Sequence, residues 1–245
     1  SYADLAIKRK EYPEAIQATE RLIQSSQNKS PLPYKLAAET RLESLKACLP
    51  EVNCLNPESL QKTEGYIERW LLIAPNQAQA YFVQGQLEQL QGHWHKALKG
   101  YQKAFQYFPE RLDYRLKLAS MLQTINQRKQ AYALLSSIPT EYFAEEALWH
   151  ELPKWFTTYP DLITHWQSEL KMMNISPLIE SRLIFWQYIF YGDNRQNHHG
   201  YKTKQWHEVE KNLSKEAEGL MLQALKLWQI GEQEWASRIC LQAHQ

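Results

Sequence analysis

The chain has 245 residues, of which 44% are hydrophobic and 22% charged, a composition typical of a globular protein rather than a disordered one. Its 28 Lys and Arg residues nearly balance 27 Asp and Glu residues, so the net charge of +1 lacks the basic excess that is usual in nucleic-acid-binding proteins. No apolar run reaches the ~18 residues that a membrane span needs. We therefore expect neither a nucleic-acid partner nor membrane insertion by this segment.

The N-terminal region, residues 1–55, leaves two alternatives open. Cys48 and Cys54 lie six residues apart in a turn-like segment. A disulfide there would suit an oxidising compartment such as a bacterial periplasm, which favours a periplasmic location, but two unpaired thiols near a helix end fit equally well. Ser1 begins inside a repeat-like pattern, so we interpret the sequence as a segment of a longer protein. Cys240, near the other end, is predicted to lie in the core.

A helix is predicted to begin at Asn56-Pro57-Glu58, because asparagine caps a helix N-terminus and proline fits its first turn. An apolar helical pattern follows through Leu60, Ile67, Trp70 and Leu71 and stops before Pro75.

A period of about 34 residues runs through the middle of the chain. Trp70, Ala104 and Ile138 share one register, and four further pairs show the same separation: Pro75 and Pro109, Gly85 and Ala119, Ala97 and Ala131, Tyr101 and Leu135. The clearest unit spans residues 78–111 and the next spans 112–138. A spacing of twelve residues between two small residues recurs at Ala3/Ala15, Ala119/Ala131 and Ala224/Ala236.

In the unit 78–111, small residues, aromatic residues and a proline occur at fixed spacings. They are Tyr81, Gly85, Ala97, Tyr101, Ala104 and Pro109. This pattern resembles the tetratricopeptide repeat. It departs from the family at Gln84 and Glu88, where a large apolar residue and a tyrosine are usual.

The same residues carry a physical argument for a helical hairpin. Gly85 is a poor helix former, so its place inside a helical pattern indicates a close contact with the second helix, where Ala97 is also small. Tyr81, Trp94 and Tyr101 are predicted to pack at the flanks of this crossing. Gly92 is expected to end the first helix, and Pro109 the second.

From these patterns and this resemblance we expect an all-α protein, a right-handed α-solenoid of about a dozen helices stacked as antiparallel pairs. Residues 1–138 form the tetratricopeptide-like repeats, and residues 139–245 continue the same solenoid as degenerate helical repeats. Within the second part, prolines divide residues 139–177 into short helices, residues 183–191 form a buried helix, and residues 192–200 form a polar loop.

No catalytic motif is present: the chain lacks a glycine-rich phosphate loop, G-x-S-x-G and H-E-x-x-H. The histidines of His93-Trp94-His95 and His198-His199 are interpreted as polar turn and loop residues rather than metal ligands. The pairs Glu145/Glu146 and Glu208/Glu210 are interpreted as solvated helix faces. Trp149, Trp155 and Trp166 could stack on carbohydrate if exposed, but core packing is the favoured interpretation. We expect no catalytic residue, cofactor or metal.

By the resemblance, the second, fifth, ninth and twelfth positions of each repeat line a concave groove that binds a partner. These positions are Gln79, Phe82, Gln86, Gln89, Asp113, Leu116, Ser120 and Gln123. Because lysine and asparagine are absent from them, we do not expect a clamp for a peptide's C-terminal carboxylate. Glutamine amides would instead hydrogen-bond an extended backbone, with Phe82 as an apolar anchor. A solvated groove, with binding on the convex face, the 192–200 loop or a chain end, remains the alternative.

The sequence thus predicts a non-enzymatic scaffold or assembly module for a protein or peptide partner, with self-association through a solenoid end also open. The alternative function is a non-catalytic appendage of a larger bacterial membrane, glycan-handling or secretion protein. A helical enzyme without a visible motif would instead show a deep polar pocket with perturbed ionisable groups.

Overall fold

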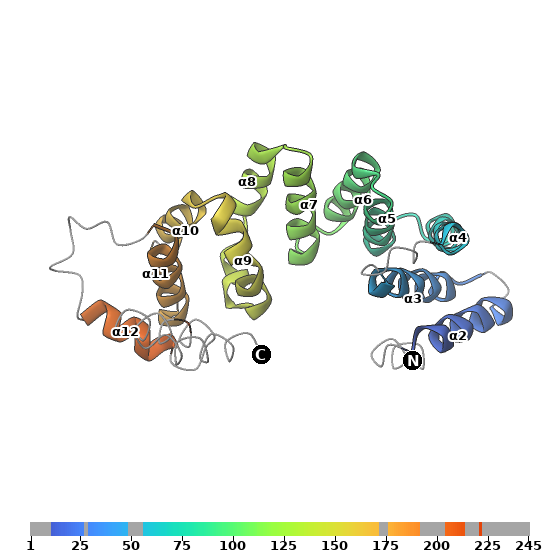
Figure 1. Cartoon of the computed structure of the whole chain (residues 1–245), viewed down its shortest axis with the longest axis horizontal. Helices are drawn as coiled ribbons and strands as arrows, with labels where there is room; N and C mark the ends of the chain where they lie inside the picture. The colour runs from blue at the N-terminus through green and yellow to red at the C-terminus, as the bar shows by residue number, and fades with distance from the viewer. Residues whose placement is uncertain are drawn as a thin grey trace. The chain divides into compact units, whose positions relative to one another are not determined.

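The computed structural model describes residues 11–26, 29–48, 56–171, 176–191, 204–213 and 221. These residues form helices and no β-strand, which confirms the all-α prediction (Figure 1). The helices are α2 (Tyr12–Ser25), α3 (Leu32–Cys48), α4 (Pro57–Ile73), α5 (Ala78–Leu90), α6 (Trp94–Tyr107), α7 (Leu112–Thr124), α8 (Arg128–Ser136), the short 3-10 helix η1 (Thr140–Ala144), α9 (Glu146–Thr158), α10 (Asp161–Lys171), α11 (Pro177–Tyr191) and α12 (Lys204–Leu213). The predictions for Ala3, Cys54, the 192–200 loop with its two histidines, Ala224, Ala236 and Cys240 lie outside the described residues.

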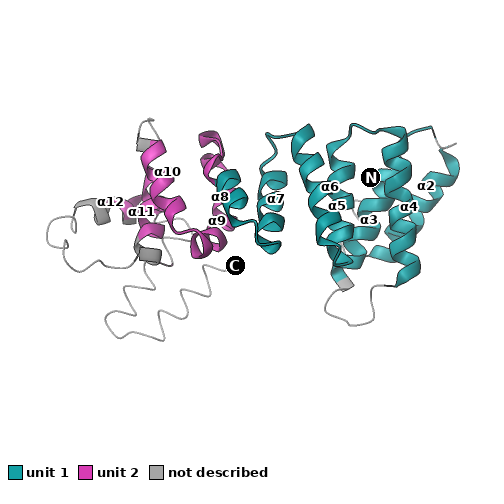
Figure 2. Cartoon of the chain, turned by 90° about the horizontal axis from the view of Figure 1, so that it is seen from above, with its two compact units in different colours: residues 1–135 teal, residues 136–245 magenta. Residues whose placement is uncertain are grey.

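The chain divides into two compact units, Ser1–Leu135 (unit 1) and Ser136–Gln245 (unit 2) (Figure 2). In unit 1, α3 packs against α2, α4 and α5, and α6 packs against α5 and α7. Helices α3 and α4 pack against each other, and so do α5 and α6. With α7 and α8 placed by the 34-residue register, α3, α5 and α7 are the first helices of successive pairs, and α4, α6 and α8 are the second helices. The predicted continuation of one solenoid through residues 139–245 stays a prediction.

The period of the sequence is visible in the backbone. Helices α5 and α7 each contain 13 residues and end in the same way. Gly92 follows α5 with φ 75°, and Asn126, one repeat later, follows α7 with φ 63°. In both turns, the N–H of this residue donates a hydrogen bond to the carbonyl oxygen three residues earlier. The N–H of the next residue donates to the carbonyl oxygen five residues before it, and the four distances are 2.8–3.0 Å. This is the Schellman arrangement that ends a helix on a left-handed residue, so the prediction for Gly92 is confirmed.

The close crossing of α5 and α6 is confirmed, and glycines occupy both sides of it. A Cβ added to Gly85 would lie 2.8 Å from the ring of Tyr101 and 3.1 Å from the carbonyl oxygen of Ala97. A Cβ added to Gly100 would lie 2.9 Å from the Cα and N of Gly85 and from the carbonyl oxygen of Tyr81. The two helix backbones therefore touch at Gly85 and Gly100, with buried Ala97, Tyr101 and Ala104 around the contact.

Helices α3, α4 and α5 surround the core next to this crossing. Trp70 is fully buried between Leu42, Ile67 and Val83, and its indole Nε1 donates to Gln77 Oε1 at 2.6 Å. The predicted start of α4 is confirmed, because the Asn56 side chain accepts a hydrogen bond from the N–H of Glu58 at 2.9 Å.

Trp94 does not pack as predicted: 44% of it is exposed. It is the first residue of α6, whereas α5 ends at Leu90, so the start of α6 lies beyond the last turn of its partner helix. Tyr101, two turns further along α6, is fully buried, and Tyr81 is half-buried and stacks on Tyr107 with ring centroids 5.6 Å apart.

Unit 2 has an aromatic core. Phe143, Phe156 and Trp166 meet edge to face, with centroids 5.2–5.8 Å apart, and Trp149 Nε1 donates to the carbonyl oxygen of Phe143. The tryptophans at 149, 155 and 166 are only 2–5% exposed, so their core placement is confirmed and they offer no stacking surface for a sugar. Leu183, Phe185 and Trp186 of α11 are buried too, as predicted for this helix.

Glu146 is not a simple solvated residue as predicted. Both of its carboxylate oxygens accept from Arg182 Nη2, at 2.9 and 2.8 Å, and the Arg182 side chain is 3% exposed. The guanidinium also lies 5.1 Å from the centre of the Trp149 ring. The carboxylate at the start of α9 therefore compensates a buried cation from α11, which a reading of α9 alone could not show.

We expect Glu146→Ala to lower the free energy of unfolding of unit 2 by about 2 kcal/mol, because it leaves the buried Arg182 without its carboxylate. The effect stays below that of a fully buried pair because the Glu146 side chain is 55% exposed. Glu145→Ala removes an exposed neighbour that makes no side-chain capping bond, and should change stability by less than about 0.5 kcal/mol. Urea denaturation of both variants tests this, and equal losses would contradict the assignment.

Candidate binding surface on the first helices

The eight predicted binding residues all lie on α5 or α7, the first helices of two successive pairs. We call the side of unit 1 that carries them the first-helix face. Gln79 forms hydrogen bonds to two neighbouring helices. Its Nε2 donates to Glu39 Oε1 of α3 at 3.2 Å, and its Oε1 accepts from the Tyr114 hydroxyl of α7 at 2.6 Å. Gln79 thus joins three successive first helices.

Phe82 forms the aromatic base of this face. Its ring centre lies 5.5 Å from that of Tyr101 and 4.6 Å from that of Tyr114, and only 9% of the residue is exposed. Leu116 of α7 is likewise 9% exposed. The predicted role of Phe82 as an anchor for a partner stays a prediction, since the structure places most of its surface against the two tyrosines.

Gln86 and Gln89, one and two turns further along α5, are half-buried. Gln89 Oε1 accepts from the Tyr101 hydroxyl at 2.7 Å, whereas its amide nitrogen has no hydrogen bond among the described residues. The Gln86 amide makes no hydrogen bond within the described part of the chain either. Two side-chain amides therefore keep donors or acceptors for another molecule.

The four residues from α7 are more varied. Asp113 is exposed and forms a bidentate ion pair with Arg111. Arg111 Nε donates to Oδ1 at 2.9 Å, and Nη2 donates to Oδ2 at 2.6 Å. Ser120 and Gln123 are half-buried, and their backbone oxygens accept bonds from Thr124 and Asn126 at the end of the helix. The structure places these four residues on one helix, and Gln79 and Phe82 of α5 reach across to that helix by contacting its Tyr114.

Two residues of the face were missed by the sequence analysis. Glu39 corresponds to no position of the repeat period: it lies 40 residues before Gln79 because the first helix pair and its connection are longer than a standard repeat. Lys117 Nζ lies 6.0 Å from the centre of the Tyr101 ring, which places a cation beside the half-buried glutamines. No sequence period pointed to either residue.

The hydroxyl groups of this face remain donors across the ordinary pH range. Burial raises the pKa of the Tyr101 phenol and that of the Tyr114 phenol above their usual value. Both groups therefore stay protonated and keep their bonds to the two glutamines. The face can bind through hydrogen bonds and apolar contact, but it brings no nucleophile next to a base.

Glu88, a departure from the repeat pattern, lies outside this set of eight residues. It is 7% exposed, and its carboxylate lies 2.8 Å from Nδ1 of the exposed His93 and 3.7 Å from Lys96 Nζ. His93, in the turn between α5 and α6, and His95, the second residue of α6, are both exposed. Among the described residues, no three His, Cys, Asp or Glu side chains are grouped so as to hold a metal ion.

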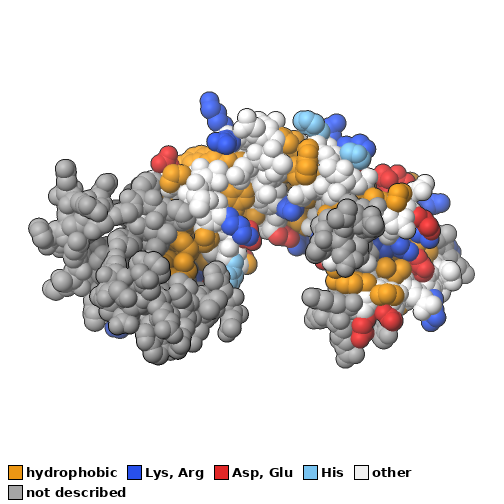
Figure 3. All heavy atoms as spheres, in the orientation of Figure 1, with side chains coloured by type: hydrophobic (Ala, Val, Ile, Leu, Met, Phe, Trp, Pro, Cys, Tyr) orange, Lys and Arg blue, Asp and Glu red, His pale blue; other side chains and the backbone are white. Residues whose placement is uncertain are grey.

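The outer surface of α6 differs from the first-helix face in charge. Lys96, Lys99 and Lys103 are exposed there, and Figure 3 shows cationic and histidine side chains gathered over this part of the molecule. None of the described helices combines the length and apolar character that crossing a membrane requires.

No protein-family model and no curated protein matches the chain. Among solved structures, the C-terminal part of a TPR repeat-containing protein from Cytophaga hutchinsonii aligns with a TM-score of 0.52 at 17% identity, over 99% of this chain and 94% of that one. A crystal structure of MamA aligns with a TM-score of 0.45 at 12% identity, over 87% and 98% of the two chains. MamA 41-end from Desulfovibrio magneticus RS-1 gives 0.34 at 16% identity, over 59% and 93%.

At 17% identity the similarity to the Cytophaga protein concerns the fold alone. It agrees with the repeated helix pairs and with the matching turns at Gly92 and Asn126. The chain therefore has the tetratricopeptide-repeat fold, an all-α solenoid of antiparallel helix pairs.

Proposed function

We propose that this protein is a non-catalytic interaction scaffold that binds an extended segment of a partner protein on the first-helix face of α5 and α7. A tetratricopeptide-type fold supports many functions, so the support for this role comes from the chemistry of this surface. The observation that carries it is the unused hydrogen-bonding capacity of the half-buried Gln86 and Gln89 amides.

An extended peptide backbone presents alternating N–H and C=O groups, and a glutamine amide can serve both. These amides stand on a preorganised base. The Phe82 ring packs against both Tyr101 and Tyr114, and the hydrogen bonds of Gln79 connect α3, α5 and α7. A rigid surface loses little conformational entropy on binding. The entropy cost of association then comes mainly from ordering the flexible partner segment.

The proposal predicts which substitutions abolish binding. In Gln86→Glu/Ser120→Glu, two half-buried positions on the first-helix face gain negative charge without removing any core packing. Because a carboxylate accepts but cannot donate hydrogen bonds, we expect this variant to retain less than about a tenth of the partner captured by the unmodified chain. The measurement is affinity capture from the source organism with quantitative mass spectrometry.

A matched control keeps the same change in charge on the other side of the helix pair. Gln102→Glu/Gln106→Glu alters two exposed positions of α6 and should capture the partner as the unmodified chain does. Circular dichroism verifies that both variants are folded. Equal capture by the first-helix variant and the unmodified chain would show that the partner binds elsewhere.

A further inference from the structure

The starts of α6 and α8 bring basic side chains to one side of unit 1. The two helices begin 34 residues apart, after turns of the same geometry at Gly92 and Asn126, and so start on the same side of the unit (Figure 1). Figure 3 shows Lys, Arg and His side chains along this side. We call its exposed residues the basic edge: Trp94, His95, Lys96 and Lys99 of α6, and Arg128 and Lys129 of α8.

Acidic side chains do not neutralise this edge. Neither α6 nor α8 contains an acidic residue. Glu88 of α5 lies 3.7 Å from Lys96 Nζ, but it is only 7% exposed and presents little negative charge to solvent. The exposed Glu110 and Asp113 lie around the start of α7, at the opposite end of α6. Residues 94–136 contain 8 basic and 2 acidic side chains, a charge of +6.

These cations occupy positions that do not favour helix stability. A helix N-terminus carries a partial positive charge, so acidic residues stabilise the first turn and basic residues destabilise it. Helices α4 and α7 follow this rule with Glu58 and Asp113. Helices α6 and α8 instead begin with Lys96 and with Arg128 and Lys129. An anionic surface outside both turns would offset this unfavourable arrangement, which favours a partner of negative charge.

Trp94 indicates what kind of anionic surface fits. It is 44% exposed among these cations. An indole has an apolar ring and a polar N–H, and a lysine has an apolar stem and a charged end, so both suit the boundary between lipid headgroups and acyl chains. A bilayer requires only that such side chains project to one side, whereas a protein partner also requires a complementary shape. The combination therefore favours a lipid surface.

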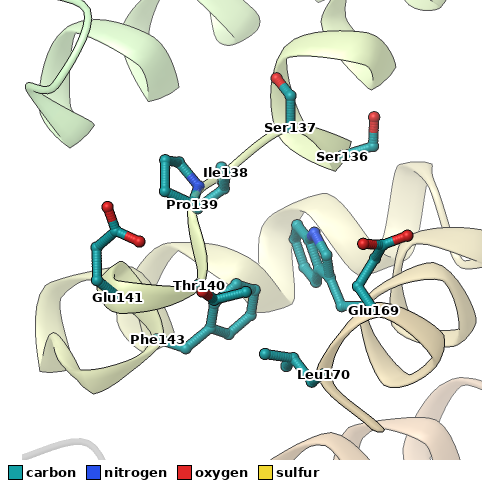
Figure 4. Close-up of a pocket in the computed structure, with 10 residues that line it drawn as sticks. Ser136, Ser137, Ile138, Pro139, Thr140, Glu141, Phe143, Glu169 and Leu170 are labelled. Atoms are coloured by element: carbon teal, nitrogen blue, oxygen red, sulfur yellow. The ribbon is translucent and has the colours of Figure 1, made fainter. Parts of the chain in front are cut away.

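Unit 2 carries the opposite charge, which hides the basic edge in the total. Residues 137–171 contain 6 acidic and 2 basic side chains, a charge of −4. Two of the acids, Glu141 and Glu169, are exposed and belong to the lining of a pocket of about 350 Å³ beside η1 (Figure 4). An anionic surface repels such a stretch, so unit 1 is the part of the chain that such a surface would attract.

We propose that the basic edge binds the surface of an anionic lipid bilayer, with its cations among the headgroups and the Trp94 ring at the boundary with the acyl chains. The contact is peripheral and requires no membrane-spanning helix. It goes beyond the proposed scaffold function, because it uses the second helices and none of the eight residues of the first-helix face. The two proposals can therefore fail separately.

Co-sedimentation of the purified chain with lipid vesicles tests the proposal. One set of vesicles is pure phosphatidylcholine, and the other contains about one third phosphatidylglycerol. At about 0.1 M salt, we expect binding to the anionic vesicles to be at least about tenfold tighter than to the neutral ones. Raising the salt to about 0.5 M should remove most of this binding, because it screens exposed charges.

Two variants assign the binding to the basic edge. Each cation near an anionic bilayer contributes roughly fivefold in affinity, so Lys99→Gln/Lys129→Gln should weaken binding about twentyfold. Trp94→Ala keeps every charge and should weaken binding at least about fivefold, because it removes the apolar contact. Both variants change exposed side chains, and circular dichroism verifies that they are folded.

A matched control removes the same charge elsewhere. Lys29→Gln/Lys154→Gln changes two exposed lysines, one before α3 and one on α9, and should stay within about twofold of the unmodified chain. Equal binding to both kinds of vesicle, or an equal loss in the control, would overturn the proposal. Binding of a polyglutamate peptide without binding of vesicles would assign the edge to an acidic protein segment and would also overturn it.

Discussion

Replacing Gly100 by alanine is expected to lower the free energy of unfolding of unit 1 by about 3 kcal/mol, the upper end of the usual effect of overpacking. The new methyl group would lie 2.9 Å from the Cα and N of Gly85 and from the carbonyl oxygen of Tyr81. All three are backbone atoms of α5, so the contact cannot be relieved by a side-chain rotation. The helices must separate, which also loosens the packing of Tyr101. Urea denaturation measures the loss.

Gly65 offers a matched control in the same unit. It lies inside α4, and apart from the neighbouring backbone of that helix, a Cβ placed on it has no atom within 4 Å. Alanine has a higher helix propensity than glycine, so Gly65→Ala should raise the free energy of unfolding by about 0.5–1 kcal/mol. A stabilising effect of Gly100→Ala as well would show that the α5 and α6 backbones do not touch.

Phe82→Glu is expected to cost at least about 4 kcal/mol, enough to unfold much of the region around α5 and α7. The substitution removes a ring that packs against Tyr101 and Tyr114 and leaves a carboxylate at a position that is 9% exposed. Circular dichroism and urea denaturation should show lost helicity and a lower transition midpoint. For this reason the partner-binding test above uses Gln86 and Ser120 rather than Phe82.

Phe82→Leu separates packing from charge. It keeps an apolar side chain but loses the aromatic contacts, so we expect a cost of about 1–2 kcal/mol with the fold retained. If Phe82→Glu instead remained as stable as the unmodified chain, the ring would be a surface group after all, available to a partner as the sequence analysis expected.

The repeat and its turns could be predicted from the sequence because they depend on local chemistry. A left-handed residue after α5 favours glycine, so Gly92 was recognisable, and the asparagine cap at Asn56 depends only on residues next to it. Gly100 carried a usable signal that the prediction left out. It lies three residues after Ala97 and four before Ala104, on the same side of α6.

The remaining features depend on which distant segments meet. Glu146 was read as solvated because its partner Arg182 comes from α11, 36 residues later. The contact of Glu39 with Gln79 escaped the repeat period because the preceding helix pair is longer. The binding positions could be assigned to α5 and α7 by register, but the sequence did not show that Phe82 would be covered by Tyr101 and Tyr114. The pocket beside η1 has no sequence signature.

The central claim is that a partner segment lies on the first-helix face. Photo-cross-linking tests it most directly, with p-benzoylphenylalanine incorporated at Gln86 in one protein and at the exposed Gln102 of α6 in another. Both proteins are irradiated with the captured partner, and the products are mapped by mass spectrometry. We predict a cross-link to one continuous partner segment from position 86 and none from position 102. A cross-link from position 102 with none from position 86 would contradict the claim.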